Sequence, residues 1–592
     1  MLLTRLVDYG RADPDVLPPF YQPALVRWVV ELAADGTPAS PQLTDLADSS
    51  DPTRRNGVVH AVPSVQRSGT ASKPMLAVDT AEYALGWASE SARDAKATSY
   101  HAAFRELVSR WQEAEPSLAA AVLHAFLCGG HAAGLARPPD LAGSQRVAFR
   151  FQERFVHDTE EARRFWAVEA SGRKGSARRG LCLACGRWER LLQTIPQQLP
   201  TRLVPGATNT ASLVSFNKAA HGFALQTQLV HTPICTTCGL LAMSALERLL
   251  DGTTSWTLPG QDARLAWWVT GEVEFDLETL DDPQPEKVAT MLGSAARGRR
   301  PADGWDLLVF CALVVGGNVS RVMVREWIEQ PLPRIQNSLR KWFEDHEIVD
   351  SWTGEVRYVG MRRLAIATGR WVRGRGEQPG HYARLGTPGA DRPSGVHRAL
   401  LSTALLAKPL PAKLLAHMVR RVRADGRLDT ERAALIRLAL RRRPGIPNPE
   451  AFMPMLNPAH RQPAYLAGRI FAALEDVQAS ASRARGDQQL NTTFTDRYFA
   501  RAITSPAVAI VAGRRDAGAW LKRLRRDRPA WAAAAERRLD ELFEQLAEAG
   551  GPPHGAILAD QAAFILGYHQ QRAATRAERV SRTASKLEGA PA

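Results

Sequence analysis

Cys182-Leu-Ala-Cys185-Gly186 and Cys235-Thr-Thr-Cys238-Gly239 are two copies of a Cys-x-x-Cys-Gly pattern. Two residues between the cysteines let both thiolates face one metal ion, and we expect each glycine to permit a tight turn beneath the pair. Only two further cysteines exist in 592 residues, so the clustering favours one zinc site with four sulfur ligands. Disulfides are the alternative, but nothing in the sequence indicates secretion. Four thiolates leave no open coordination position, so we expect a structural Zn²⁺ that braces residues 186–234.

The chain is strongly basic. Its 76 lysines and arginines outnumber 61 aspartates and glutamates, which gives a formal net charge of +15 at pH 7. Arginine forks match phosphate oxygens, so this balance favours binding to a polyanion such as nucleic acid. A high-GC genome is an alternative reason for arginine in place of lysine, but it does not explain the net charge.

Membrane insertion and secretion are not expected. The sequence has no run of about 18 uncharged apolar residues, so we expect neither a membrane span nor a membrane partner. Residues 1–9 are too few and too polar for a secretory signal. The default expectation is therefore a reducing, cytoplasmic location.

The apolar pattern predicts an α+β fold: an irregular mixed N-terminal body with a zinc-knuckle insert, followed by an all-helical C-terminal bundle. Residues 24–32, 263–270 and 307–315 have strand-like patterns, and residues 242–250 and 327–343 have helical ones. The length indicates several domains. The predicted regions are 1–150 (mixed), 151–255 (zinc-braced), 256–390 (mixed), 396–450 (basic helices) and 453–592 (helical bundle).

Two segments of the C-terminal part are rich in arginine. Residues 411–443 carry ten lysines or arginines and three acids, which predicts a basic face on a pair of helices. The candidate phosphate contacts of this segment are Arg420, Arg423 and Arg427. Those of the second segment are Arg514, Arg515, Lys522, Arg523 and Arg526. A merely solvated face is the alternative in both cases, because runs of charge are commonly only that.

Several short motifs follow one another along nearly the whole chain. They are Met1-Leu-Leu-Thr-Arg-Leu-Val-Asp-Tyr9, Arg67-Ser-Gly with Asp79-Thr-Ala-Glu-Tyr83-Ala-Leu-Gly86, Ala211-Ser-Leu-Val-Ser-Phe-Asn217, Asn318-Val-Ser-Arg321-Val-Met-Val-Arg325-Glu-Trp327, Asn457-Pro-Ala with Tyr465-Leu-Ala-Gly-Arg469-Ile-Phe471, Asp496-Arg-Tyr-Phe499 and Leu566-Gly-Tyr-His569. In this order they resemble the large subunit of the type I-C CRISPR Cascade surveillance complex. Thr80 departs from the family's usual Asn, Gly316-Gly317 departs from its Ser-Pro, and the cysteine pairs are not general in that family.

The resemblance implies a function and a set of partners. Such a subunit sits at the foot of a crRNA-guided complex, reads the protospacer-adjacent motif on duplex DNA, helps to open the strands and recruits a separate helicase-nuclease. The implied partners are crRNA, target double-stranded DNA, the backbone and other Cascade subunits, and the helicase-nuclease. The resemblance also implies that the protein is not an enzyme.

Two polar loops are the candidates for motif reading, which needs small loops that expose backbone together with a few side-chain donors. The first loop supplies Arg67, Ser68, Gly69, Thr70 and Lys73, and the second supplies Asn209, Asn217 and Lys218. Asn318, Arg321 and Arg325 are candidate backbone contacts, and the two arginines would share one face if their segment is helical. Turn formation and surface solvation are the alternatives for these residues.

Two other functional classes are considered. One is a zinc-stabilised nucleic-acid-binding protein outside CRISPR defence, which composition and cysteines support equally well. The other is a metal-dependent hydrolase, which is disfavoured because the sequence has no His-Glu-x-x-His, P-loop or Gly-x-Ser-x-Gly motif.

The C-terminal region also carries an expectation about gene expression. Type I-C systems resemble one another in making their small subunit from an internal start within this gene. Met453 and Met455 lie where that start would fall, after a proline-rich break, so a free fragment from there to Ala592 is expected. Copies of it would hold the displaced strand. Two incidental methionines before an ordinary helical domain are the alternative.

Overall fold

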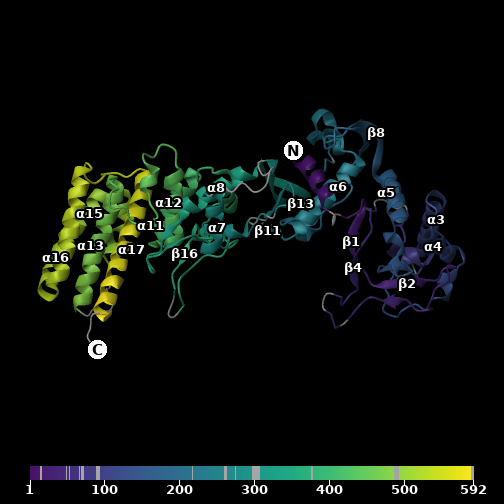
Figure 1. Ribbon diagram of the computed structural model, residues 1–592, viewed down its shortest axis with the longest axis horizontal. Helices are drawn as coiled ribbons and strands as arrows, with labels where there is room; N and C mark the ends of the chain where they lie inside the picture. Colours follow the sequence, from purple (N-terminus) through teal and green to yellow (C-terminus); the bar gives the residue numbers. More distant parts are fainter. Residues whose placement is uncertain are drawn as a thin grey trace. The chain divides into compact units, whose positions relative to one another are not determined.

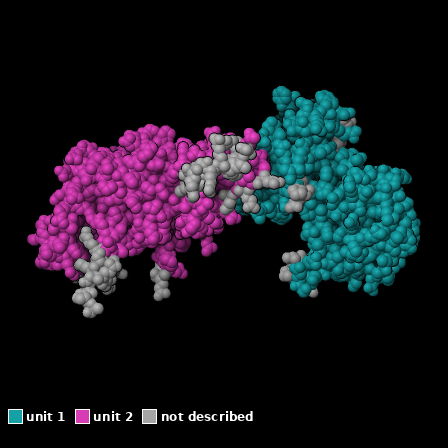
Figure 2. All heavy atoms as spheres, in the orientation of Figure 1, with its two compact units in different colours: residues 1–257, 262–267, 312–327 teal, residues 258–261, 268–311, 328–592 magenta. Residues whose placement is uncertain are grey.

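The protein is described by a computed structural model (Figure 1). It describes the chain except residues 14–16, 49, 52–53, 66, 68–71, 89–93, 217, 259, 261–262, 272, 274, 276, 297–306, 375–377, 486–492 and 589–592. The chain forms two compact units (Figure 2). Unit 1 comprises residues 1–257, 262–267 and 312–327, and unit 2 comprises residues 258–261, 268–311 and 328–592.

Unit 1 is a mixed α/β body. Its helices are α1 (Leu2–Ala12), α2 (Ala81–Ala84), α3 (Asp94–Ala114), α4 (Leu118–Cys128), α5 (Glu160–Lys174) and α6 (Thr236–Asp251). Its strands are β1 (Tyr21–Val26), β2 (Trp28–Leu32), β3 (Thr44–Asp45), β4 (Val58–Pro63), β5 (Val78–Thr80), β6 (Arg146–Phe151), β7 (Arg154–Phe155), β8 (Gly175–Leu181), β9 (Trp188–Leu192) and β10 (Ala207–Ser212). The strand-like run at residues 24–32 therefore contains two strands, separated at Arg27.

The first sheet of unit 1 has the order β3-β2-β6-β5, with β7 paired to β6. Strands β2 and β6 are parallel, while β5 runs antiparallel to β6. Alternation separates its two faces: Phe149 packs with Phe104 of α3 and Phe126 of α4, whereas Ala148 packs with Val26 of β1. The helices thus cover one face, and the antiparallel pair β1–β4 contributes to the core on the other.

A second sheet has the order β10-β13-β12-β11, with β11 (Ser255–Leu258), β12 (Ala263–Val269) and β13 (Val309–Pro331). The strand-like runs at residues 263–270 and 307–315 are confirmed. The helical run predicted at 327–343 begins later, because residues 327–331 still belong to β13 and α8 starts at Leu332. Pro333 lies in the first turn of α8, where its missing N–H removes no hydrogen bond.

Unit 2 contains α7 (Pro285–Ala296), α8 (Leu332–His346) and α9 (Met361–Ala367) with the short antiparallel pairs β14 (Ile348–Val349)–β15 (Val356–Arg357) and β16 (Trp371–Val372)–β17 (His381–Tyr382). From residue 396 its described elements are all helical, as predicted, and include one short 3₁₀ helix at Pro449–Ala451. They are α10 (Val396–Leu406), α11 (Ala412–Asp425), α12 (Thr430–Arg442), α13 (Pro463–Arg485), α14 (Phe494–Thr504), α15 (Pro506–Asp527), α16 (Pro529–Glu548) and α17 (Leu558–Glu588).

Local sequence sets the helix ends of this bundle. Thr493 and Asp496 form a capping box at the start of α14. Pro506 and Pro529 occupy the first positions of α15 and α16 and divide the basic segment from its neighbours. The α+β architecture with a helical C-terminal region is therefore confirmed.

Two of the C-terminal motifs meet at the crossing of α13 and α17. A Cβ at Gly468 would overlap the Phe564 carbonyl, and a Cβ at Gly567 would overlap the Tyr465 carbonyl, so both glycines allow the two helices to approach closely. The Tyr465 hydroxyl donates to Gln570 Oε1 at 2.6 Å. These motif residues thus pack the bundle core.

Across the described residues, no helix is both long enough and apolar enough to span a membrane.

Candidate metal centre and nucleic-acid interface

The first cysteine pair forms the turn of the β8–β9 hairpin. The Gly186 N–H donates to the Cys182 carbonyl at 2.9 Å, and the Cys182 N–H donates to the Arg187 carbonyl at 2.9 Å. Gly186 has a φ of +68°, a conformation that L side chains rarely adopt, and this agrees with its expected role in a tight turn.

The second pair lies at the beginning of α6. Cys235 is the N-cap residue and Cys238 is in the first turn. Gly239 is needed for a different reason from the one predicted: it is helical, and a Cβ there would come closer than 3.0 Å to Cδ1 of Leu192 on β9. The N–H of Leu192 donates to the Ile234 carbonyl at 2.9 Å, so the hairpin and the helix start are joined directly beside the four cysteines.

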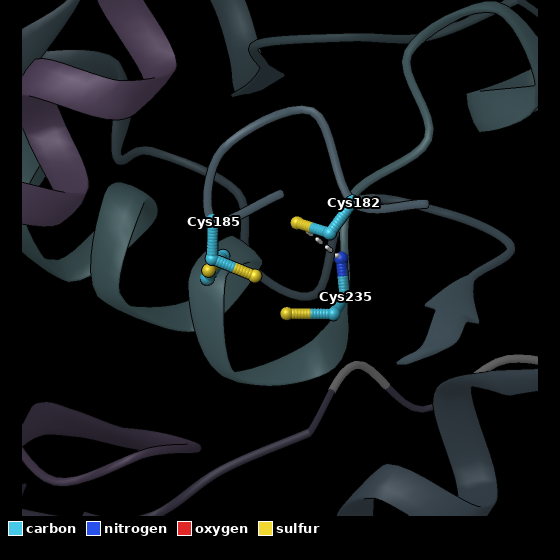
Figure 3. A group of neighbouring side chains, drawn as sticks. Cys182, Cys185 and Cys235 are labelled. Atoms are coloured by element: carbon cyan, nitrogen blue, oxygen red, sulfur yellow. Dashed lines mark hydrogen bonds between the residues drawn. The ribbon is translucent and has the colours of Figure 1, made fainter. Parts of the chain in front are cut away.

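The four cysteine sulfurs converge on one point. They all lie within 4.8 Å of one another (Figure 3 shows Cys182, Cys185 and Cys235 from this group). Tetrahedral zinc with Zn–S bonds of about 2.3 Å places its sulfurs roughly 3.8 Å apart. The donor set and its spacing therefore fit a closed four-sulfur metal site.

The protein environment already favours a thiolate at one of these positions. Burial raises the pKa of the Cys182 thiol, but hydrogen bonds from the N–H groups of Cys235, Cys185 and Ala184 outweigh it and leave that pKa at about 7. The Cys235 N–H lies 3.3 Å from the Cys182 sulfur. Burial raises the pKa of Cys235 to about 11 and also raises that of Cys238. A cation among the sulfurs would stabilise the thiolate form of all four.

The first predicted reading loop is anchored by a charged clamp at its base. The guanidinium of Arg67 forms an ion pair with the buried Asp79 and donates from Nε to the Lys73 carbonyl at 2.9 Å. It also lies over the Tyr83 ring, 4.3 Å from its centroid. Asp79 additionally accepts the Met75 N–H at 2.7 Å. Arg67, Asp79 and Tyr83, hereafter the Arg67 clamp, thus hold both ends of the loop.

The clamp gives a structural role to part of a motif that sequence reasoning had treated as a signature only. Asp79 and Tyr83 belong to the Asp-Thr-x-x-Tyr-x-x-Gly stretch. An acid and an aromatic residue close to a basic loop were the signal in the sequence that could have identified partners for Arg67. Lys73 is half-buried at the end of the loop. Ser68, Gly69 and Thr70 lie outside the described residues.

The second predicted loop is exposed on one edge of the second sheet. Asn209 lies in β10 and is exposed, and Lys218 is exposed beyond the end of that strand. Asn217 lies outside the described residues. Strand β10 pairs in parallel with β13, with Ala207 opposite Val319 and Ser212 opposite Arg321. The structure therefore brings this loop beside the Asn318–Trp327 motif.

Asn318, Arg321 and Arg325 are all exposed on β13. The helix considered for this segment is wrong, but Arg321 and Arg325 still share a face because strand side chains alternate with a period of two. Val319, Val322 and Val324 were the signal for a strand, since β-branched residues favour that conformation.

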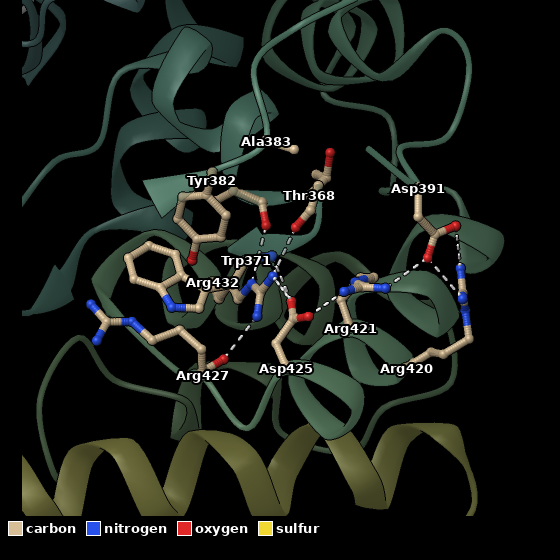
Figure 4. A network of polar contacts seen from close by, with 12 residues as sticks. Thr368, Trp371, Tyr382, Ala383, Asp391, Arg420, Arg421, Asp425, Arg427 and Arg432 are labelled. Atoms are coloured by element: carbon tan, nitrogen blue, oxygen red, sulfur yellow. Dashed lines mark hydrogen bonds and ion pairs between the residues drawn. The ribbon is translucent and has the colours of Figure 1, made fainter. Parts of the chain in front are cut away.

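Most arginines of segment 411–443 have structural partners. Figure 4 shows Arg420, Arg421 and Arg432 with theirs. Arg432 is completely buried and donates to the carbonyls of Ala367 at 3.1 Å and Gly369 at 2.9 Å and to Asp425 at 2.6 Å. Arg437 is also buried and donates to the Phe452 carbonyl at 2.8 Å. These side chains hold elements of unit 2 together and are not available to a ligand.

The predicted phosphate contacts of this segment differ in their surroundings. Arg420 lies 2.9 Å from Asp391, and hydrogen bonding by Arg420 lowers the pKa of Asp391 to about 2. Arg427 lies 3.3 Å from Asp429 and stacks over Trp371. Arg423 is exposed on α11, with no ion-pair partner among the described residues. Arg423 is therefore the best placed of the three for an outside phosphate.

The second basic cluster lies on α15. Arg514, Arg515, Lys522 and Arg526 are exposed, and Arg523 is half-buried. Arg514 lies 3.5 Å from Asp540, and Arg526 lies 2.6 Å from Asp527. The arginine of each pair is exposed, so these ion pairs contribute little to stability. The exposed cations share one side of the helix because their spacing follows its period.

Comparison with known proteins identifies a family. The sequence model of a family described as CRISPR-associated protein (Cas_Csd1) matches residues 3–576. No curated protein matches the chain.

Proposed function

The chain belongs to the Cas_Csd1 family of CRISPR-associated proteins, and from this premise we propose that it is the large subunit of a type I-C Cascade complex. In that complex it would read the protospacer-adjacent motif on target DNA, aid strand opening and recruit the helicase-nuclease. The single observation that carries the proposal is the family match from residue 3 to residue 576, which spans the collinear motifs up to Leu566–His569. Membership of this family also argues against a nucleic-acid-binding protein outside CRISPR defence.

The Arg67 clamp supports a reading role for the adjoining loop. A loop that enters a DNA groove must keep its shape while hydrogen bonds from its tip to water are replaced by hydrogen bonds to base edges. Arg67 engages Asp79 and Tyr83 inside the protein, so its part is to position the loop. Lys73, at the end of the clamped segment, is the candidate donor to a base edge.

We propose that the four cysteines hold a structural Zn²⁺. Four sulfur ligands satisfy a tetrahedral ion, and the residues join the β8–β9 hairpin to the start of α6. The metal would thereby fix both ends of residues 186–234, which include the second candidate loop. Because this ligand set leaves no position for substrate or water, we assign the centre no catalytic role.

The test compares two DNA duplexes bound by the complex assembled with guide RNA. Both carry the target sequence, but only one carries the correct adjacent motif. Lys73→Ala should weaken binding to the motif-bearing duplex about tenfold, the effect of losing one good base contact, and leave the other duplex unchanged. Asn217→Ala tests the second loop in the same way.

Lys341→Ala is the matched control, because it removes the same ammonium group from an exposed position on α8, in the other compact unit of the chain. It should leave binding to both duplexes unchanged. An equal loss on both duplexes for Lys73→Ala would reduce Lys73 to a phosphate contact and contradict its reading role.

A further inference from the structure

The β8–β9 hairpin carries an apolar pair on its surface. Leu181 and Trp188 lie directly opposite each other across the two strands. Trp188 is 67% exposed and Leu181 is 54% exposed, although both are large and apolar. The indole therefore offers most of its surface to an outside molecule.

Two arginines extend the surface around this pair. Arg179 faces Arg190 across the strands, two residues further from the turn than Leu181 and Trp188, and both arginines are exposed. Strand side chains alternate between the two sides of a hairpin, so these four residues lie on the same side. Arg179, Leu181, Trp188 and Arg190 are hereafter the hairpin face.

The two arginines are held close together without a counter-charge. The Cys182 N–H donates to the Arg187 carbonyl, which places the pair Arg179–Arg190 at a non-hydrogen-bonded position of the ladder, where opposite Cα atoms are only about 4.5 Å apart. Like charges directly opposite each other destabilise a sheet. Neither arginine has an ion pair or side-chain hydrogen bond among the described residues, and Glu189 alternates to the other side. This repulsion would be relieved by an anion from outside.

The Trp188 ring also lacks a cation from its own chain. The other exposed tryptophans in the described ranges are Trp352 and Trp531, and each carries an arginine over its ring: Arg576 at 4.0 Å and Arg528 at 5.6 Å from the ring centroid. No guanidinium and no aromatic ring lies over Trp188 in the part of the chain that the structure describes. Its ring is therefore open to stacking by another molecule.

Backbone contacts hold the hairpin in place. The Leu183 N–H donates to the Pro233 carbonyl at 2.9 Å, and the Leu192 N–H donates to the Ile234 carbonyl at 2.9 Å. Cys182, which follows Leu181, is buried in the cysteine cluster. A platform that is already fixed loses little conformational freedom when a ligand binds to it.

We propose that the hairpin face binds single-stranded nucleic acid. A base would stack on Trp188 beside Leu181, and phosphates on either side of that base would pair with Arg179 and Arg190. A nucleic acid matches the open ring and the unpaired charges together, whereas an acidic protein segment matches only the charges. A single strand is favoured over a duplex, because stacked base pairs leave no base face free for the indole. The site does not rest on the motif-reading role proposed above.

The test measures binding of the full chain to one short single strand of arbitrary sequence, prepared as DNA and as RNA. Trp188→Ala should weaken binding roughly tenfold, the effect of losing one stacked base, whereas Trp188→Phe should keep most of the affinity. Neither change should alter the dependence of affinity on salt, because neither removes a charge.

The combined variant Arg179→Ala/Arg190→Ala should act through the phosphates instead. It should weaken binding and flatten the slope of log K against log[salt] by about 1.4, which is about 0.7 for each of two lost phosphate contacts. A general disturbance of the hairpin would not separate these two signatures. If Trp188→Ala does not fold, the affinity of Trp188→Phe and the salt slope of the arginine variant still decide the proposal.

Trp352→Ala is the matched control, because it removes an indole of nearly equal exposure, 66%, from the other compact unit. It should leave binding unchanged. The proposal would be overturned by an equal loss in Trp352→Ala, by unchanged affinity of Trp188→Ala for both strands, or by an unchanged salt slope of the arginine variant.

Further probes identify the ligand. Trp188→Ala should not change affinity for a duplex of the same sequence with closed ends, and an equal loss there would contradict stacking. Loss of poly-glutamate binding in the arginine variant, with oligonucleotide binding intact, would assign the face to an acidic protein segment and overturn the proposal. A loss confined to DNA or to RNA would identify the strand that the face holds, and an equal loss would show that the contact does not involve the sugar. These assays omit guide RNA and the adjacent motif, so failure of the motif-reading proposal would not affect them.

Discussion

Gly239→Ala is expected to weaken the metal centre by pushing its two halves apart. A Cβ at this position would approach Leu192 Cδ1 more closely than 3.0 Å, and Leu192 is buried. Overpacking of this kind costs roughly 1–3 kcal/mol, while alanine in place of glycine in a helix returns up to about 1 kcal/mol. The expected net loss of stability is therefore about 1–2 kcal/mol. Because the site forms as the protein folds, the same free energy should weaken metal binding by about tenfold.

Leu192→Val supplies the compensating change, because it removes Cδ1, the only atom of the described residues that the new Cβ would approach within 3.0 Å. In that background Gly239→Ala should become stabilising, since only the gain in helix propensity remains. Denaturant unfolding of the metal-loaded protein measures the four free energies, and chelator competition measures metal affinity. The coupling between the two sites should be about 2 kcal/mol.

Gly186→Ala is the contrasting variant. No atom of the described part of the chain lies within 4 Å of its Cβ position, but its φ of +68° penalises a side chain by about 1–2 kcal/mol. Leu192→Val should not rescue this loss. If Gly239→Ala has the same effect with leucine and with valine at position 192, the packing argument is wrong.

Four further outcomes are expected. Metal analysis of the purified protein should find about one zinc per chain, and Cys182→Ser should remove it; zinc retained in that variant would rule out the four-sulfur centre. Arg423→Glu should lower nucleic-acid affinity on all sequences and flatten its dependence on salt, and an unchanged salt slope would make this residue a solvated one. The native gene should yield a short C-terminal product that disappears when Met453 and Met455 are both changed to Leu; its persistence in the mutant would exclude a start at these codons. Burial lowers the pKa of His346 from 6.5 to about 4. The resulting contribution to stability, up to about 3 kcal/mol, should be present above pH 6.5 and be lost as the pH falls towards 4. Between these two pH values His346→Phe should reduce the number of protons taken up on unfolding by about one, and equal uptake in both proteins would refute this.

The clustering of the four cysteines was the most predictable part of the molecule. Two residues between cysteines set a local geometry that needs no knowledge of the rest of the chain. The sequence could not show why Gly239 is present, because Leu192 lies far from it along the chain and meets it only in the folded protein. The architecture was predictable for a similar reason, since helical and strand periods are local properties.

The basic helices show where such reasoning stops. Arginine at positions 420, 432 and 437 looks alike in the sequence, yet the first is exposed and the other two are buried. The two buried arginines differ from Arg420 because they donate hydrogen bonds to backbone carbonyls of other segments. These carbonyls belong to Ala367, Gly369 and Phe452. A pattern of charge along one helix contains no information about carbonyls that tertiary folding brings to it.

The position of the two cysteine pairs changes what a backbone break would do to this protein. With metal bound, residues 186–234 form a ring whose ends are tied at the β8–β9 hairpin and the start of α6. Closing a ring of 49 residues removes about 3 kcal/mol of chain entropy from the unfolded state. A single cut by a protease in the exposed stretch at 218–226 would open the ring but leave both ends held by sulfur, so only cleavage together with chelation would free them.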